Sequence, residues 1–189
     1  MVVARTDTRE RILDSAERLF FSDGIGVTGV DRVAADAGVA IATLYQHVGS
    51  KDGLLEAVLE RRLQAWAAQW EASIAAATTP RDRVLALFDA LVEFRRSSGT
   101  TQWCCFLATA SERPRRTGAD DPVLRLVEAD TTALVARLRE LVDEAGVADP
   151  DATVARLLVV YTGALASLLR GEPADPLGAA RAIADVLLP

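Results

Sequence analysis

Residues 42 to 47, with the sequence ATLYQH, combine small, hydroxyl, amide and imidazole side chains over about two turns of a helix. A helix of this kind can bond base edges and phosphates when it lies in the major groove of DNA. The segment also contains the only histidine of the chain. The side chains that we expect to face such a groove are those of Ala42, Thr43, Tyr45, Gln46 and His47.

A helix-turn-helix is the element that would position these side chains, and the preceding residues fit its requirements. Ala34 is small enough for two helices to cross closely, and Gly38 tolerates the positive φ of a tight turn. Leu44 would face the interior. The sequence therefore predicts one helix from about residue 28 to residue 38 and a second over 41–48. The alternative is a plain helical corner that carries a surface histidine.

The rest of the chain predicts an all-α fold of about nine helices. Alanine and leucine dominate, and apolar residues recur at three- and four-residue spacing. Asp-Pro or Thr-Pro pairs stand where several helices would begin, and residues 113–120 indicate an exposed loop. Besides the two helices above, we expect helices over residues 8–22, 50–77, 80–96, 101–112, 122–145, 151–170 and 177–188.

Three segments together resemble the DNA-binding domain of the TetR family of transcriptional regulators. They read TGV at 28–30, VAADAGV at 33–39 and TLYQHVGSKDGLL at 43–55. The resemblance implies a homodimeric bacterial repressor that binds double-stranded operator DNA carrying an inverted repeat. It assigns residues 1–50 to a helix-turn-helix DNA-binding domain. Residues 51–189 would form a helical domain for dimerisation and for a small-molecule effector.

The same resemblance assigns roles to two further polar residues and reveals three departures. It implies that Thr28 caps the second helix and touches a phosphate. It also implies that Lys51, the only lysine of the chain, holds a phosphate at the start of the fourth helix. Ala40 replaces the serine cap usual in the family, which removes up to about 1 kcal/mol of capping energy. Gly29 and Val48 also differ from the usual residues, so the operator sequence stays open.

Aromatic side chains at helical spacing in the C-terminal part predict a pocket for a largely apolar or aromatic effector. For each single residue, packing in the core is the alternative. A cation-binding aromatic cage is another alternative for the cluster, and oxidant sensing is one for the adjacent Cys104 and Cys105. The residues expected to form the pocket are Trp66, Trp70, Phe88, Val92, Trp103, Phe106 and Tyr161.

The last two predicted helices are rich in small and apolar residues, which suits close packing between two copies of the chain. Burial of the same residues within one chain is the alternative. Two copies would hold two DNA-reading helices at a fixed spacing, and an effector that favours another spacing would release the DNA. The residues expected at the dimer interface are Leu157, Leu158, Leu165, Leu168, Ile183 and Leu187.

The composition limits how the chain binds DNA and excludes several other functions. With 21 Lys and Arg against 27 Asp and Glu, the net charge is −6, so DNA binding must come from locally placed donors. Two adjacent cysteines and a single histidine exclude a disulfide framework and a His/Cys zinc site. No catalytic motif is recognisable, so we expect no enzyme activity, no metal and no cofactor.

The longest uncharged stretch of the C-terminal half has 13 residues, and the chain opens without an export signal. These features predict a cytoplasmic protein without a membrane partner. Two rival functions stay open at this point. One is an all-α interaction protein that does not bind DNA, and the other is an enzyme.

Overall fold

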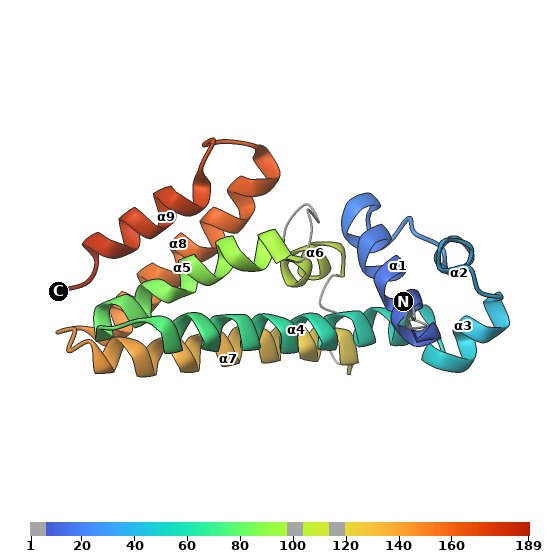
Figure 1. Cartoon of the computed structure of the whole chain (residues 1–189), viewed down its shortest axis with the longest axis horizontal. Helices are drawn as coiled ribbons and strands as arrows, with labels where there is room; N and C mark the ends of the chain where they lie inside the picture. The colour runs from blue at the N-terminus through green and yellow to red at the C-terminus, as the bar shows by residue number, and fades with distance from the viewer. Residues whose placement is uncertain (1–6, 98–103, 114–119) are drawn as a thin grey trace, which may run out of the picture. The chain divides into compact units, whose positions relative to one another are not determined.

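The computed structural model describes residues 7–97, 104–113 and 120–189 of the chain. These residues form nine α-helices and no β-strand, which confirms the predicted all-α class (Figure 1). The helices are α1 (Thr8–Asp23), α2 (Val30–Ala37), α3 (Ile41–Val48), α4 (Lys51–Ala76), α5 (Pro80–Ser97), α6 (Cys105–Glu112), α7 (Pro122–Glu144), α8 (Pro150–Arg170) and α9 (Pro176–Val186).

Short-range capping explains why several helices begin where the sequence predicts. The carboxylates of Asp149 and Asp175 accept hydrogen bonds of 3.1 and 2.9 Å from backbone N–H groups three residues further on. Each is followed by a proline, whose missing N–H leaves no donor unsatisfied in the first turn. The hydroxyl of Ser50 likewise accepts a hydrogen bond of 3.0 Å from the N–H of Gly53. These caps confirm that the sequence places the starts of α4, α8 and α9 to within about a residue.

Two expectations about the region between α5 and α7 need correction. The helix expected from residue 101 begins as α6 at Cys105, because Cys104 is not helical. The residues directly before Cys104 lie outside the described part of the chain. Arg113, expected in an exposed loop, is half-buried because two carboxylates bind its guanidinium. The loop residues that follow it, up to residue 119, also lie outside the described part.

The helices divide into two compact units, each with its own apolar core. The first unit consists of Met1–Arg62 and Cys105–Val127, and the second of Leu63–Cys104 and Glu128–Pro189. Residues of α4 and of α7 therefore belong to both units. Side chains that are at most 1% exposed mark the two cores: Ile12, Leu13, Phe20, Leu44 and Leu54 in the first unit, and Leu87, Phe88, Leu138 and Leu141 in the second.

Among the described helices, α8 has the length and composition that would allow it to cross a membrane. Its mean hydropathy is 1.7 over a window of 18 residues, and 28% of that window is buried. The sequence-based expectation of no span counted only uncharged residues, whereas a hydropathy average tolerates one or two charges. Length and composition are weak grounds for a span, because a helix that packs against another polypeptide has the same character.

Candidate functional site

The residues between α1 and α4 form the predicted helix-turn-helix. Gly38 ends α2 in the left-handed conformation, with φ +64° and ψ +41°, as the tight turn requires. The N–H of Val39 then bonds the carbonyl of Ala34 at 3.0 Å, which closes the turn. Ala34 is 1% exposed and Leu44 is fully buried, so the small residue and the inward leucine have the predicted roles.

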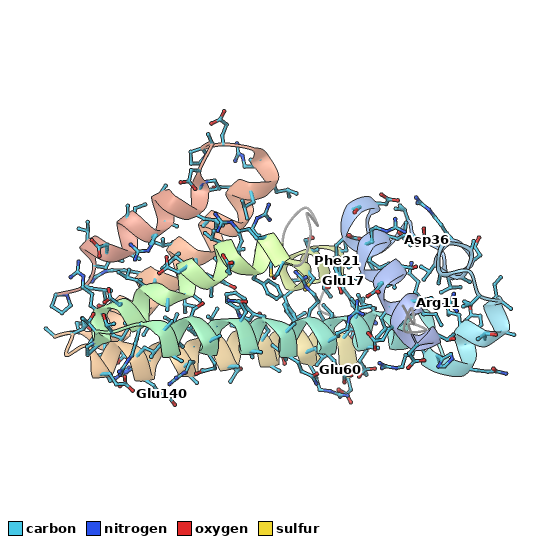
Figure 2. The ribbon with its side chains drawn as sticks, in the orientation of Figure 1. Arg11, Glu17, Phe21, Asp36, Glu60 and Glu140 are labelled. Atoms are coloured by element: carbon cyan, nitrogen blue, oxygen red, sulfur yellow. The ribbon has the colours of Figure 1, made fainter. Side chains whose placement is uncertain are left out.

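Two arginines of α1 hold α2 in place. Arg11, labelled in Figure 2, donates from Nη1 to the carbonyl oxygen of Ala37 at 3.0 Å and so satisfies a free carbonyl at the C-terminus of α2. Arg18 forms an ion pair with Asp36, which also lies on α2. The hydrogen bond from Arg18 lowers the pKa of the Asp36 carboxyl. Both arginines are therefore used in packing the first unit.

The polar side chains of α3 point away from this core. Tyr45 is 42% exposed, and Ala42, Gln46 and His47 are exposed as well, whereas Thr43 is half-buried. Within residues 7–97, 104–113 and 120–189, no hydrogen bond or ion pair engages the side chains of Tyr45, Gln46 or His47. The five residues that the sequence assigns to a DNA groove thus lie together on one helix, and the polar groups of Tyr45, Gln46 and His47 have no partner in the part of the chain that the structure describes.

Thr28 does not cap α2 as expected. Gly29 is the N-cap residue and makes no side-chain cap, while the Thr28 side chain is fully buried. Its hydroxyl lies 2.7 Å from the carbonyl of Gly24 and 3.3 Å from that of Leu19, and it donates into this pair of acceptors. The hydroxyl therefore closes the loop between α1 and α2, whereas a phosphate contact needs an exposed donor.

Lys51 begins α4 and reaches back to the same loop. Its Nζ donates to the carbonyl of Gly26 at 3.2 Å and lies 5.9 Å from the centre of the Phe20 ring. The side chain is half-buried, so its charge is held beside the loop between α1 and α2 instead of moving freely. The predicted phosphate contact by Lys51 stays a prediction.

Glu112, at the end of α6, is a site residue that the sequence analysis missed. Its two carboxylate oxygens accept hydrogen bonds from the N–H groups of Ile25, at 3.1 Å, and Gly26, at 2.7 Å. These N–H groups belong to the loop that Thr28 and Lys51 also hold. Because the partners are more than 80 residues apart in sequence, no local pattern indicates the contact.

In the second unit, three aromatic rings lie around the ring of Trp66. The ring of Trp66 lies 6.1 Å from that of Trp70, 5.5 Å from that of Phe94 and 6.4 Å from that of Tyr161. Both indoles are more than 90% buried, and the Nε1–H of Trp70 has no acceptor among the described residues. Three predicted pocket residues thus come together. Phe94 joins them although it was not among the residues expected to form the pocket.

The other predicted pocket residues are not part of this group of four rings. Phe88 lies in the core of the second unit, Val92 is half-buried, and Phe106 is buried in the first unit. Trp103 lies outside the described residues. A surface pocket of about 300 Å³ in the second unit is lined by none of the predicted residues. Its two arginines, Arg83 and Arg137, are already paired with glutamates, so it offers no free charge.

Asp130, on α7, is a second residue that the sequence analysis missed. It precedes the buried Leu134, Leu138 and Leu141 at helical spacing and is itself half-buried. Burial raises the pKa of its carboxyl to about 6. The core-facing side of α7 therefore includes an acidic residue, and burial makes the ionised form of its carboxyl unfavourable.

The predicted dimer residues divide between the core and the surface. Leu157 and Leu165 are buried within the second unit, Leu158, Leu168 and Leu187 are half-buried, and Ile183 is 54% exposed. The structure adds exposed apolar residues that were not predicted. They are Val159 and Leu169 on α8 and Val186 on α9, of which Val186 is 84% exposed.

Two helices joined by a tight turn, the second of which presents polar side chains to solvent, define a helix-turn-helix. Residues 12–58 match the family model described as bacterial regulatory proteins, tetR family. The chain is also similar to SCO4454, a TetR-family transcriptional regulator from Streptomyces coelicolor. The TM-score is 0.86, with 28% identity, over 95% of this chain and 93% of that one.

Two further relatives extend the comparison. A protein of Streptomyces avermitilis, solved as a TetR-type transcriptional regulator, is 30% identical over 95% of this chain and 99% of its own, with a TM-score of 0.71. The transcriptional activator FasR of Mycolicibacterium smegmatis is 32% identical over 90 residues, which are 48% of this chain but only 41% of FasR. The chain belongs to the TetR family of transcriptional regulators. It is a DNA-binding regulator and not an enzyme.

Proposed function

We propose that the chain is a ligand-responsive repressor that binds an inverted-repeat operator as a homodimer. The outer face of α3 carries the proposal. Its polar side chains have no partner among the described residues, whereas Arg11 and Arg18 nearby are engaged. In this proposal residues 1–50 bind DNA, and residues 51–189 bind the effector and form the dimer.

At the DNA, the α3 side chains of Ala42, Thr43, Tyr45, Gln46 and His47 enter or border the major groove. Lys51 contacts a phosphate at the N-terminus of α4, where the helix dipole favours an anion. The net charge of −6 gives no general attraction to DNA, so these few donors supply it, doubled by the second copy. Binding should therefore weaken steeply as salt rises.

Helices α8 and α9 pack against each other within the second unit (Figure 1). The dimer would form through the faces of these two helices that the second unit leaves exposed. Val159 is 74% exposed, Ile183 54% and Val186 84%, and large apolar side chains in this number indicate a covered surface. Gly163 lies on α8 with nothing within 4 Å of an added Cβ, so a partner helix has room to approach closely. This face also explains the high hydropathy of α8.

The effector would bind at the aromatic cluster around Trp66. A buried N–H without an acceptor is unfavourable by about 1–3 kcal/mol. A ligand that supplies a hydrogen-bond acceptor to Trp70 Nε1 would therefore bind favourably. Aromatic walls favour a flat or apolar body. The proposed effector is therefore a small, largely apolar or aromatic molecule with at least one hydrogen-bond acceptor.

Release of DNA would follow from differential binding of the effector to two states of the dimer. Lys51 and Trp66 lie on the same helix, α4. A movement of α4 caused by effector binding at the aromatic cluster would therefore also move Lys51. The relative FasR is called a transcriptional activator, so the effect of this protein on transcription has to be measured as well as its DNA binding. A DNA target and membership of the family support a cytoplasmic location, and the proposal includes no membrane partner, metal or cofactor.

Selection of bound fragments from bacterial genomic DNA at moderate salt, followed by sequencing, tests this function. We expect an enriched inverted repeat upstream of a gene whose transcription falls when the protein is present. Absence of any enriched sequence would contradict the proposal and favour an all-α interaction protein. For the effector, Trp66→Ala should change the response of transcription to added aromatic compounds more than it changes DNA affinity.

A further inference from the structure

The outward face of α3 has a composition that selects among base pairs. Leu44 is fully buried, and Ala42 and Gln46 lie two positions before and after it, on the opposite side of the helix. Both are exposed, and they are one turn apart.

Each of these side chains has a preferred base in the major groove. A glutamine amide pairs with N6 and N7 of adenine, and a methyl group packs against the 5-methyl group of thymine. Guanine is read mainly by arginine or lysine, and residues 41–48 contain neither. Three arginines elsewhere in the first unit, Arg11, Arg18 and Arg32, are bound to acceptors of the chain itself.

We propose that α3 reads A·T base pairs, with the Ala42 methyl against a thymine methyl and the Gln46 amide against an adjacent adenine. The inference rests on the proposed function, in which α3 lies in the major groove. Residues one turn apart are separated by about 6 Å along the helix, so the two base pairs lie within about two steps of each other. His47, at the side of this face of α3, would contact the sugar-phosphate backbone of the DNA.

Selection from a random pool of double-stranded DNA with wild-type protein and with Gln46→Arg tests the adenine contact. Wild type should enrich an inverted repeat, and Gln46→Arg should change one A·T position in each half-site to G·C. At that position, 7-deazaadenine should weaken wild-type binding about tenfold and leave Gln46→Leu unaffected. Gln64→Arg, at an exposed glutamine of α4, is the matched control and should leave every preference unchanged.

Replacement of single thymines by deoxyuridine in the selected repeat tests the methyl contact. One replacement next to the Gln46 position should weaken wild-type binding about fourfold, the effect of one lost methyl contact. The same replacement should not affect Ala42→Ser. Both α3 positions are exposed, so the variants should keep the thermal midpoint of the wild type.

The outcomes separate this inference from the proposed function. An enriched inverted repeat with G·C required at the position that Gln46→Arg alters would overturn the inference and leave the function standing. Unchanged preferences in Gln46→Arg, or equal binding of thymine and deoxyuridine repeats, would do the same. A pool without any enriched sequence would overturn both.

Discussion

The guanidinium of Arg113 binds the carboxylate of Asp52 through two parallel hydrogen bonds, each 2.8 Å long. Its Nε also donates to Asp121 at 2.5 Å, so one side chain joins the end of α6 to the starts of α4 and α7 in the first unit. Two-pronged contacts are the strong form of arginine–carboxylate pairing. The hydrogen bonds from Arg113 lower the pKa of Asp52 and of Asp121.

Removal of the Arg113 guanidinium should destabilise the first unit in a pH-dependent way. Arg113→Gln should lower the free energy of unfolding at neutral pH by about 1 kcal/mol, because Asp52 is 63% exposed and water screens the pair. Carboxylates with a lowered pKa stabilise the fold above their unfolded-state pKa, and this contribution is lost as the pH falls through the folded-state pKa. The difference between variant and wild type should therefore shrink below about pH 4.

Urea unfolding at neutral and acidic pH measures this difference. Arg96→Gln is the control, since Arg96 is 73% exposed and pairs only with Glu93 in the described structure. It should change the unfolding free energy by less than about 0.5 kcal/mol. A loss in Arg113→Gln that stays constant with pH would contradict the role assigned to the carboxylates.

Asp130 should have the opposite pH dependence. Burial raises the pKa of its carboxyl from 3.8 to about 6, so the folded state carries an unfavourable charge above that pH. Asp130→Asn should raise the unfolding free energy at pH 7.5 by about 1–3 kcal/mol and have little effect at about pH 3, where the acid is protonated in both states. Asp143→Asn, at an exposed position of α7, is the control in the same urea titrations. Equal gains at both pH values would argue against a buried charge.

Gly53 should not tolerate a side chain, because the backbone of the turn between α3 and α4 leaves no room for a Cβ atom. A Cβ at this position would lie 2.2 Å from the carbonyl oxygen of Val48, which is backbone and has to move. We expect Gly53→Ala to lower stability by about 1–3 kcal/mol, as other steric insertions do. Affinity for the operator should fall as well, since the turn sets the direction of α3. A thermal midpoint and operator affinity both equal to those of wild type would contradict the close approach.

Val159→Glu should separate the proposed dimer without unfolding the chain. Val159 is 74% exposed, so the new carboxylate meets water in the monomer but would be buried in a dimer through α8. Sedimentation equilibrium should therefore give a monomer for this variant and a dimer for wild type. Ala136→Glu makes the same change at an exposed position of α7 and should remain a dimer. A dimeric Val159→Glu would move the interface away from this face.

The sequence predicted well those features that depend on neighbouring residues. The caps at Ser50, Asp149 and Asp175 involve a residue and a backbone N–H three positions away, so the signal and the structure are equally local. The positive φ at Gly38 is local in the same sense. The exposed face of α3 follows from helical periodicity once Leu44 is known to face inward.

Features that depend on distant parts of the chain were not predicted. Thr28 has the residue type of a helix cap, but the packing of α1 turns its hydroxyl inward. Glu112 meets a loop more than 80 residues earlier in the sequence. For α8, periodicity indicated an apolar helix, yet it could not decide that Leu157 faces the core and Val159 the solvent. That choice depends on which neighbouring helices cover each side.

The most direct test of the account compares wild type with Tyr45→Ala and His47→Ala on the inverted repeat recovered from genomic DNA. Fluorescence anisotropy should show weaker binding for both variants by at least about tenfold, because each loses a contact to base or phosphate. Both side chains are exposed, so the dimer mass and the thermal midpoint should match wild type. Undiminished DNA affinity in both variants, or a dimer that dissociates in either, would contradict the claim that α3 is the DNA-reading helix.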